Sequence, residues 1–335
     1  MQYEPPFKIT ARAVSLIAEI CEMLGRMEAG RDSASQLRLR RINQIRSIQG
    51  SLAIEGNTLS IEQITAILEG KRVIAPPREI QEARNALKAY DMLDQWQPSS
   101  LNDLLRAHEI LMTGLVDNPG ALRKKGAGVM AGDQVVHMAP PARRVAELMN
   151  NLLIWLQKTD QHPLIASSVF HYEFEFIHPF ADGNGRMGRL WQTLILSRWQ
   201  PVFIDIPVES MVFEHQAEYY DALAMSTKNA ESSAFIDFML ETILEVVKAR
   251  TTPEVTPEVT PEVKKMLSIL KKAPSLSRQE IQQQLGLRDE KHFREFYQQP
   301  AVAAGLIEMT IPDKPTSRLQ KYRLTEKGRQ VLKSI

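Results

Sequence analysis

The side chains best suited to chemistry are concentrated in one short run, from His178 to Arg189. Gly183 and Gly185 allow the backbone to turn tightly and to approach a ligand closely. The free N–H groups at the start of the following helix then form an anion site. Arg186 and Arg189 lie three residues apart on one face of that helix, so both can bind polyphosphate oxygens in bidentate fashion. The spacing predicts a phosphate-binding cradle.

Three other residues of the run could act on a bound polyphosphate. Asn184 can cap the helix, and Asp182 offers the kind of carboxylate that holds Mg²⁺ between phosphates. Imidazole side chains titrate near neutral pH, so His178 could remove the proton of an attacking hydroxyl. The alternative is an ordinary helix end and turn, with solvent-facing arginines. The combination of so many compatible residue types in one run favours a site.

The sequence on both sides of the run predicts amphipathic helices that hold its two ends. Apolar residues recur at spacings of three and four over 162–176, directly before the run, and over 186–199, which continues from it. The same pattern predicts helices over 10–56 (two or more), 60–68, 79–96, 100–112, 145–157 and 213–249. We therefore expect a mainly α fold.

One segment of this region departs from the helical pattern. Between Arg123 and Pro141, two short apolar stretches flank Gly132-Asp133, a pair typical of a tight turn. Pro140 and Pro141 then end the extended stretch before the next helix. The segment predicts a small β-hairpin.

A threefold Thr-Pro-Glu-Val repeat, from Thr252 to Val263, marks a domain boundary. Its prolines exclude a regular helix and favour an extended spacer. Residues 264–335 contain 15 Lys and Arg against 7 Asp and Glu, a net charge of +8, so the rest of the chain carries −7. Three predicted helices (263–270, 277–285, 289–304) and two strands (305–309, 320–324) follow the order of a winged helix.

The bulk composition is that of a soluble globular protein. The chain has 335 residues, of which 44% are hydrophobic and 24% charged, enough for two or three compact domains. No apolar run comes near the ~20 residues that cross a bilayer, and the first residues lack the order of a secretory signal. Cys21 is the single cysteine, and its apolar neighbours at helical spacing indicate a buried thiol. We expect a cytoplasmic protein.

The run from His178 to Arg189 resembles the HxFx(D/E)GNGRxxR signature of Fic proteins at every constrained position. Its context, from Thr113 to Phe238, also resembles the Fic core. The resemblance implies transfer of AMP from ATP to a Ser, Thr or Tyr hydroxyl of a protein, with Mg²⁺ as cofactor and pyrophosphate as the leaving group. It implies a Fic-type helical bundle with a small β-hairpin flap, to which the chain adds its predicted winged helix-turn-helix (α+β) domain.

The resemblance also implies a role for each residue of the signature. His178 would be the base and Asp182 the Mg²⁺ ligand. An anion hole for the α- and β-phosphates would be formed by Gly183, Asn184 and Gly185. Arg186 would bind the β-phosphate, and Arg189 the γ-phosphate.

Two further elements of the site follow from the resemblance. Three residues of the hairpin would form a flap that aligns an acceptor segment as an added strand, namely Val135, Val136 and His137. Tyr219 and Tyr220 match the paired tyrosines that often border the adenine pocket, although a half-buried helix face is an equal alternative. Some Fic proteins have Asn where this chain has Thr227, so the adenine contacts stay open.

An upstream segment, Ser51 to Asn57, resembles the (S/T)xxxE(G/N) inhibitory motif of Fic proteins that carry their inhibitory helix on the N-terminal side. Ser51, Glu55 and Gly56 occupy its constrained positions. Glu55 paired with Arg189 would occupy the guanidinium that should bind the γ-phosphate, so ATP would settle in a non-productive pose. Without this context Glu55 would be a solvated carboxylate. In some Fic proteins the same glutamate aligns water for removing AMP, so the reverse hydrolysis is also open.

We expect four segments: an N-terminal helical region with the inhibitory helix (1–100), a Fic catalytic core (101–250), the repeat linker (251–263) and the winged-helix domain (264–335). In the last of these, Ser277 to Glu280 has the pattern of a capping box. Basic residues cluster on its predicted recognition helix and wing, namely Lys291, His292, Arg294, Arg318, Lys321 and Arg323. DNA is one partner for such a module, and protein docking or dimerisation is the alternative.

The expected partners are a protein substrate, the chain itself by auto-modification, and a second copy in a homodimer. A Doc-like protein phosphotransferase is a rival function. Gly185 argues against it, because glycine leaves the β-phosphate subsite open. The other rival is a transcriptional regulator whose Fic body only senses nucleotide. His178 argues against that, since a sensor needs no base.

Overall fold

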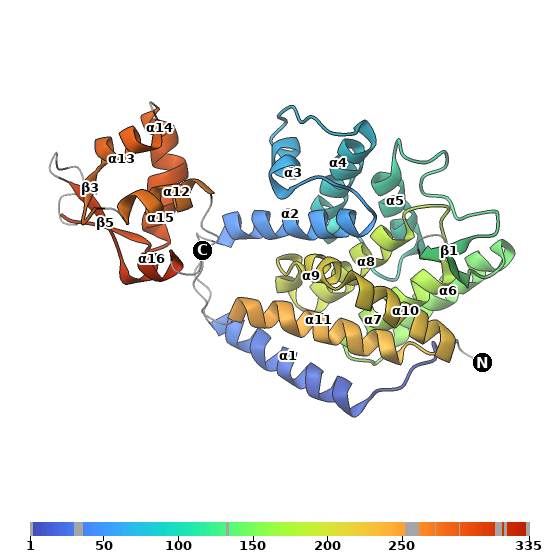
Figure 1. Ribbon diagram of the computed structural model, residues 1–335. Coiled ribbons are helices and arrows are strands. Elements are labelled where there is room, and N and C mark those ends of the chain that lie inside the picture. Colours follow the sequence, from blue (N-terminus) through green and yellow to red (C-terminus); the bar gives the residue numbers. More distant parts are fainter. Residues whose placement is uncertain are drawn as a thin grey trace. The chain divides into compact units, whose positions relative to one another are not determined.

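The computed structural model describes residues 3–29, 36–131, 134–251, 261–271, 273–287, 289–311, 317 and 320–332. The chain forms two compact units, Met1–Thr252 and Pro253–Ile335 (Figure 1). The predicted linker repeats over 252–260 and Arg318 lie outside the described residues. In the ranges given above, no helix is both long and apolar enough to cross a lipid bilayer.

The first unit is almost entirely helical, which confirms the predicted mainly α fold. Its α-helices are α1 (Ala11–Ala29), α2 (Gln36–Ile54), α3 (Ile61–Leu68), α4 (Pro77–Asp91), α5 (Leu101–Met112), α6 (Ala142–Lys158), α7 (Pro163–Ile177), α8 (Asn184–Trp199), α9 (Val208–Glu214), α10 (Gln216–Asn229) and α11 (Ser233–Thr251). Two short 3-10 helices, Leu93–Gln95 and Pro201–Ile204, follow α4 and α8 in the chain. Figure 1 shows α1 lying alongside α11.

Helices α7 and α8 form the centre of this unit. Most residues of both helices are buried, and α8 buries polar side chains as well as apolar ones, among them Arg186 and Arg189. Pro163 starts α7, where its missing N–H costs nothing. One continuous hydrophobic core joins them to α1, α2 and α5, so residues 1–100 and 101–250 share it. Cys21, predicted as buried, is half-buried, with its Sγ 3.7 Å from Nε2 of His162.

The predicted hairpin is present as β1 (Gly128–Ala131) and β2 (Gln134–Met138). The strands are antiparallel, Gly128 pairs with Met138, and the register shifts between Val129 and Met130. The expected turn at 132–133 lies outside the described residues. The hairpin thus projects from the segment between α5 and α6.

The second unit has its own core and combines helices with a three-stranded antiparallel sheet of order β3-β5-β4. Its elements are α12 (Pro261–Leu270), β3 (Leu276–Ser277), α13 (Arg278–Leu285), α14 (Glu290–Phe293), a π-helical segment (Arg294–Gln298), α15 (Gln299–Ala303), β4 (Ile307–Met309), β5 (Lys321–Leu324) and α16 (Glu326–Val331). Ser277 and Glu280 form the predicted capping box.

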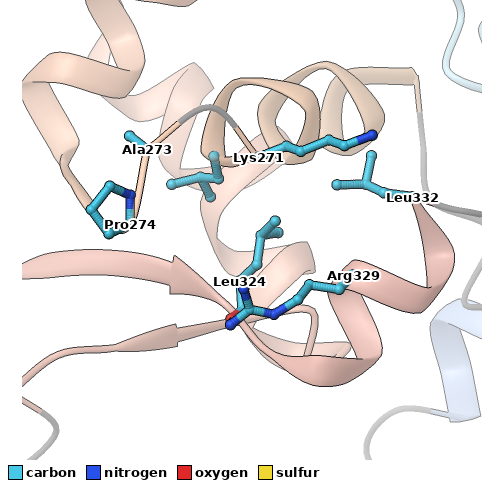
Figure 2. A pocket seen from close by; sticks show the side chains of 7 residues that line it. Lys271, Ala273, Pro274, Leu324, Arg329 and Leu332 are labelled. Carbon is cyan, nitrogen blue, oxygen red and sulfur yellow. The ribbon is translucent and has the colours of Figure 1, made fainter.

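The second unit also contains a cavity of about 470 Å³, lined by Leu270, Lys271, Ala273, Pro274, Leu324, Arg329 and Leu332 (Figure 2). Five of these residues are apolar, and Lys271 and Arg329 are basic. None of the residues expected to do chemistry lines it.

Candidate active site

The site is built on the loop that joins α7 to α8. Helix α7 ends at Ile177, and His178 is its C-cap. The N–H of His178 still donates to the carbonyl of Phe174 (2.9 Å), while the backbone of His178 lies in the left-handed region (φ 48°, ψ 63°). A non-glycine residue adopts this conformation only where surrounding contacts hold it. The loop therefore needs anchors.

The first anchor is Arg123, which is almost fully buried. Its Nε donates to the carbonyl of His178 (2.7 Å), and its Nη1 and Nη2 donate to the carbonyls of Lys125 (2.8 Å) and Pro140 (2.6 Å). Lys125 precedes the hairpin and Pro140 follows it. A single guanidinium thus ties both ends of the hairpin to the left-handed residue at the end of α7.

The second anchor is Asn184. Its Oδ1 accepts from the N–H of Phe180 (2.9 Å) and its Nδ2 donates to the carbonyl of the same residue (3.0 Å). The predicted helix cap was wrong: Asn184 is the first helical residue, Gly183 is the N-cap with φ 82°, and no side chain caps the helix. The asparagine closes the loop instead, which leaves the N–H groups of the first turn of α8 without a side-chain cap.

The third anchor is His108 on α5. Its Nδ1 accepts from the N–H of Gly120 (2.8 Å), so the ring proton lies on Nε2, which donates to the carbonyl of Asp182 (3.0 Å). The ring stacks on Phe180 with 3.6 Å between centroids. Burial lowers the pKa of His108 to about 4. The imidazole is therefore neutral near pH 7 and keeps the tautomer that holds the loop.

The anion site predicted at the start of α8 is occupied by a carboxylate of the chain itself. A Cβ placed on Gly185 would overlap Oε1 of Glu55, and a Cβ on Gly183 would lie 2.6 Å from Sδ of Met112. At Gly183 the backbone conformation (φ 82°) favours glycine, whereas a side chain at Gly185 would have to displace the carboxylate of Glu55. The carboxylate of Glu55 lies against the first turn of α8, where a helix N-terminus favours an anion.

Glu55 reaches this position from the end of α2 and pairs with Arg189. The Nη2 of Arg189 donates to Oε1 of Glu55 (2.6 Å) and to the carbonyl of Ser51 (3.0 Å), while its Nε donates to Oγ of Ser51 (3.1 Å). Burial is the largest influence and would lower the pKa of Arg189, but the charge and hydrogen bond of Glu55, together with nearby Tyr219 and Glu175, raise the pKa above its usual value. The structure thus brings Ser51, Glu55 and Arg189 together. Glu55 and Arg189, which form the ion pair, are 134 residues apart in the sequence.

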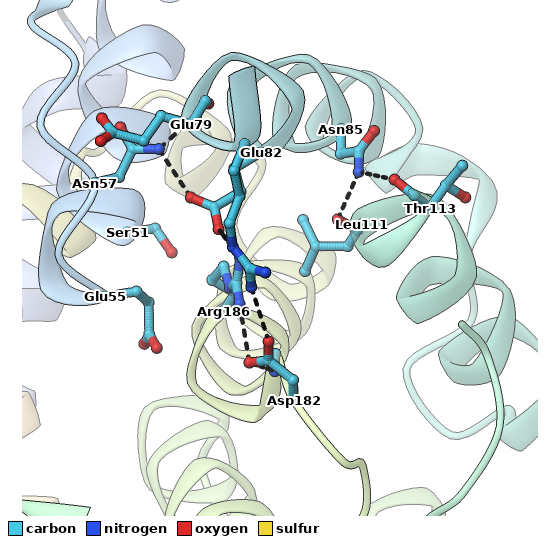
Figure 3. A network of polar contacts seen from close by, with 12 residues as sticks. Ser51, Glu55, Asn57, Glu79, Glu82, Asn85, Leu111, Thr113, Asp182 and Arg186 are labelled. Carbon is cyan, nitrogen blue, oxygen red and sulfur yellow. Dashed lines mark hydrogen bonds and ion pairs between the residues drawn. The ribbon is translucent and has the colours of Figure 1, made fainter. Parts of the chain in front are cut away.

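Arg186 faces different partners. Its Nη2 lies 3.2 Å from Oδ1 of Asp182, and its Nη1 lies 3.3 Å from Oε1 of Glu82 on α4 (Figure 3). The side chain is buried, yet its Nε has no hydrogen-bond acceptor among the residues that the structure describes. A buried donor without an acceptor is costly. The oxygen of a bound phosphate would satisfy it.

A single carboxylate, Asp182, is available for Mg²⁺. The side chain is 41% exposed, and the described ranges contain no cluster of three or more His, Cys, Asp or Glu that could hold a metal by itself. Mg²⁺ is commonly held by one or two carboxylates together with substrate phosphates, keeping water on its other positions. One partly exposed carboxylate beside a phosphate cradle fits that mode.

The two tyrosines expected at the adenine pocket differ in exposure. Tyr219 is 1% exposed, and its hydroxyl lies 3.1 Å from Nε2 of His171 inside the core. Tyr220 is partly exposed, and burial, then the charge of Glu55, raises the pKa of its hydroxyl. The Oγ1 of Thr227 donates to the carbonyl of Leu223 (2.9 Å). Contact of either tyrosine with adenine stays a prediction.

The expected flap residues can be placed only by their backbone. Val135, Val136 and His137 lie within β2, and their side chains are outside what the structure describes. In the described hairpin, β2 pairs with β1 alone. Alignment of an acceptor strand at the flap therefore stays a prediction.

With this geometry in view, comparison with known proteins is decisive. Residues 98–196 match the Fic/DOC family, and residues 261–325 match the family described as "Filamentation induced by cAMP protein Fic-like, C-terminal domain". A solved Fic family protein from Desulfovibrio desulfuricans is 49% identical, with a TM-score of 0.73 over 97% of this chain and 99% of that one. The chain belongs to the Fic family. The resemblance inferred from the His178–Arg189 signature is confirmed.

More distant Fic relatives carry a functional name. The protein adenylyltransferase Fic of Nematostella vectensis is 28% identical over 255 residues, which cover 69% of this chain and 57% of that protein. The protein adenylyltransferase fic-1 of Caenorhabditis elegans is 33% identical over 187 residues, covering 52% and 34%. This chain spans about half the length, or less, of these curated relatives. A solved C. elegans Fic-1 fragment is 24% identical with a TM-score of 0.61, which shows the shared fold.

Sequence reasoning missed four residues of the site: Arg78, Glu82, His108 and Arg123. None lies in a motif, and each reaches the loop from another segment. The one available signal was a charged or polar side chain inside an otherwise apolar stretch, such as His108 between Ala107 and Ile110 on α5. Such residues are seldom buried without a partner.

Proposed function

We propose that this protein is an adenylyltransferase that moves AMP from ATP to a Ser, Thr or Tyr hydroxyl of a protein, including its own. The observation that carries the proposal is the buried Arg186 in the first turn of α8, whose Nε has no acceptor among the residues that the structure describes. The names of the relatives from N. vectensis and C. elegans support the same reaction.

In this reaction His178 removes the acceptor's proton as the hydroxyl oxygen attacks the α-phosphorus of ATP. The new bond joins that oxygen to phosphorus, the bond from the α-phosphorus to the bridging oxygen breaks, and pyrophosphate leaves with the electron pair. The N–H groups of the first turn of α8, from Asn184 onward, stabilise the developing negative charge. Arg186 and Arg189 bind the β- and γ-phosphates.

Mg²⁺ held by Asp182 would neutralise phosphate charge during the transfer. The protein's own contribution is to keep the carboxylate in place. His108 does so by fixing the carbonyl of Asp182, and Arg186 by pairing with its side chain.

We also propose that the reaction is self-inhibited. Glu55 occupies the guanidinium of Arg189 and the space above Gly185, so it competes with the γ-phosphate for both. Its segment, 51–57, belongs to the N-terminal region, and the catalytic residues belong to the core of residues 101–250. The same carboxylate could direct water in the reverse hydrolysis of AMP.

For the second unit we propose a winged-helix docking module, on the basis of its helices and three-stranded sheet. Arg323 pairs with Glu308 (2.6 Å), which reduces the basic charge near the strands, and the side chains of Lys291 and His292 lie outside the description. We propose a protein partner, with DNA as the alternative. Salt-dependent retention on duplex DNA would reverse that preference.

The decisive experiment combines two variants with α-labelled ATP and Mg²⁺, read by intact mass. Glu55→Gly should add AMP to the protein itself or to a lysate acceptor, because Arg189 is then open to the γ-phosphate. The wild type should add at least about tenfold less.

The control is Glu55→Gly/His178→Ala, which should add none. Equal labelling of wild type and Glu55→Gly would contradict the inhibition, and labelling that survives His178→Ala would contradict the assigned base. Absence of any AMP addition with Glu55→Gly would sink the proposed reaction.

A further inference from the structure

Four charged side chains at the phosphate site form a closed ring of alternating sign. Arg78 contacts Asp182 (Nη2 to Oδ2, 3.2 Å), Asp182 contacts Arg186 (3.2 Å), Arg186 contacts Glu82 (3.3 Å) and Glu82 contacts Arg78 (Oε1 to Nε, 3.3 Å). Helix α4 supplies Arg78 and Glu82, and the loop with the start of α8 supplies the other two. Figure 3 shows Glu82 and Asp182 on two sides of the Arg186 guanidinium.

The two halves of the ring differ in burial. The side chains of Glu82 and Arg186 are 11% and 5% exposed, whereas those of Arg78 and Asp182 are 59% and 41% exposed. Exposed ion pairs contribute little and exchange readily, while a buried charge needs a constant partner. Arg78 is therefore the member that can leave Asp182, and Glu82 is the lasting counter-ion of Arg186.

The contact with Glu82 also decides which edge of Arg186 stays available. Glu82 binds Nη1, and the opposite edge of the guanidinium presents Nε and Nη2. Nε has no acceptor in the described part of the chain, and Nη2 has the exchangeable contact with Asp182. The Nε–Nη2 edge therefore presents two donors that can bind a phosphate in bidentate fashion.

Glu82 takes its own position from the segment that carries the inhibitory glutamate. Its Oε2 accepts from Nδ2 of Asn57 (2.9 Å), and Asn57 is itself buried, with its Oδ1 accepting from the N–H of Leu59 (3.0 Å). Asn57 lies two residues after Glu55. One segment thus contacts Arg189 directly, through Ser51 and Glu55, and Arg186 indirectly, through Asn57 and Glu82.

We propose that Glu82 is a positioning residue for AMP transfer: held by Asn57, it orients Arg186 so that the Nε–Nη2 edge faces the β-phosphate. The proposal rests on the proposed function. Pyrophosphate gains charge as it leaves, so an oriented Arg186 should stabilise the transition state more than bound ATP. Residues 51–57 then control both phosphate-binding arginines, one by blocking and the other by orienting.

The test compares Glu82→Gln with Glu79→Gln, both in Glu55→Gly to remove the direct block. Glutamine keeps the shape of Glu82 and an acceptor for Asn57 but loses the charge that holds Arg186. Glu79 is the matched control: it lies one turn earlier on α4 and also contacts this segment, through the N–H and Oγ1 of Thr58, without an ion pair to Arg186. Thermal unfolding of each variant checks that the fold is kept.

We expect Glu82→Gln to lower kcat about tenfold and to raise KM for ATP only about threefold, while Glu79→Gln changes neither. Asn57→Ala should also lower kcat. Combining it with Glu82→Gln should lower kcat little further, because Asn57 acts on Arg186 through Glu82. Equal kinetics of the two glutamine variants would overturn the proposal. Tighter ATP binding with faster transfer in Glu82→Gln would also overturn it, because Glu82 would then compete with ATP.

Equilibrium binding of ATP with Mg²⁺, measured by calorimetry, separates this proposal from the reaction itself. If Glu55→Gly transfers no AMP, the proposed function fails, yet Glu82→Gln should still weaken ATP binding about threefold relative to Glu79→Gln. Unchanged binding in both variants would count against Glu82 whether or not transfer occurs.

Discussion

At the scale of single residues, Arg189 explains why the contact with Glu55, which we propose to be inhibitory, can be replaced by a phosphate. Its guanidinium is buried, so it cannot be left without an anion. Glu55 supplies that anion here through one contact, from Nη2 to Oε1, and a γ-phosphate carries the same charge sign. The proposed inhibition would therefore be relieved by exchanging one anion for another at Arg189, without rearrangement of the core.

A second acid near Arg189, Glu175 on α7, gives a pH prediction. Burial raises the pKa of Glu175 to about 8, against the lowering effect of Arg189, and its Oε1 has no hydrogen-bond partner in the described structure. The folded protein therefore holds a proton that the unfolded chain releases near pH 4.5. Stability from this group is present below that pH and is lost as the pH rises toward about 8.

We therefore expect Glu175→Gln to flatten the fall in unfolding free energy between about pH 5 and 8, with the largest gain over wild type at the alkaline end. Urea unfolding at several pH values measures it. Glu241 on α11, whose partner Arg12 stays charged over this pH range, provides the control as Glu241→Gln. Parallel pH curves for wild type and Glu175→Gln would show that Glu175 ionises normally in the fold.

At the scale of elements, the hairpin and the α7–α8 loop are joined through Arg123. Because its guanidinium binds carbonyls before the hairpin, after it and at His178, displacement of any one element must break buried hydrogen bonds. If the hairpin holds an acceptor strand as a flap, Arg123 would thus fix the position of that flap relative to His178. The acceptors of the Arg123 guanidinium are backbone carbonyls, so a change of side-chain rotamer in a partner residue cannot release them.

Arg123→Lys should loosen this junction, because an ammonium cannot reproduce the planar fork that serves four carbonyls, including that of Ile177. We expect a loss of about 3 kcal/mol in unfolding free energy from the unsatisfied carbonyls. Hydrogen exchange of residues 128–138 should quicken more than exchange within α8. Arg143→Lys, at an exposed position of α6, is the control and should change neither measurement. Equal protection of the hairpin in both variants would show that Arg123 does not hold it.

The elements themselves were predictable to different degrees. The spacing of apolar residues placed α7 and α8 within one or two residues, because their patterns are long and end at Pro163 and the glycine pair. The same spacing predicted one helix over 289–304, where the structure has a π-helical segment before Pro300, which cannot donate a helical hydrogen bond. The ring of Arg78, Glu82, Asp182 and Arg186 was not predictable, since its two halves lie about a hundred residues apart.

At the scale of the whole molecule, the chain consists of two hydrophobic cores that share no residue. The last repeat departs from the predicted extended linker: α12 begins at Pro261, where a first-turn proline is tolerated, and Val263 is buried in the second core. Every residue assigned to the proposed reaction, from Ser51 to Tyr220, lies in the first unit. The second unit is therefore expected to choose partners rather than to take part in the chemistry.

The two units should accordingly unfold and function independently. We expect calorimetry of the full chain to show two thermal transitions, and residues 1–252 alone to keep the transition of the first unit, because each core is complete within its own unit. In Glu55→Gly, residues 1–252 should bind ATP with Mg²⁺ within about twofold of the full chain, since no phosphate-binding residue is removed. Cleavage within the repeat of the full-length Glu55→Gly protein is the matched control, because it keeps both units in the same solution. If residues 1–252 lose ATP binding while the cleaved protein retains it, the second unit must contribute to the nucleotide site.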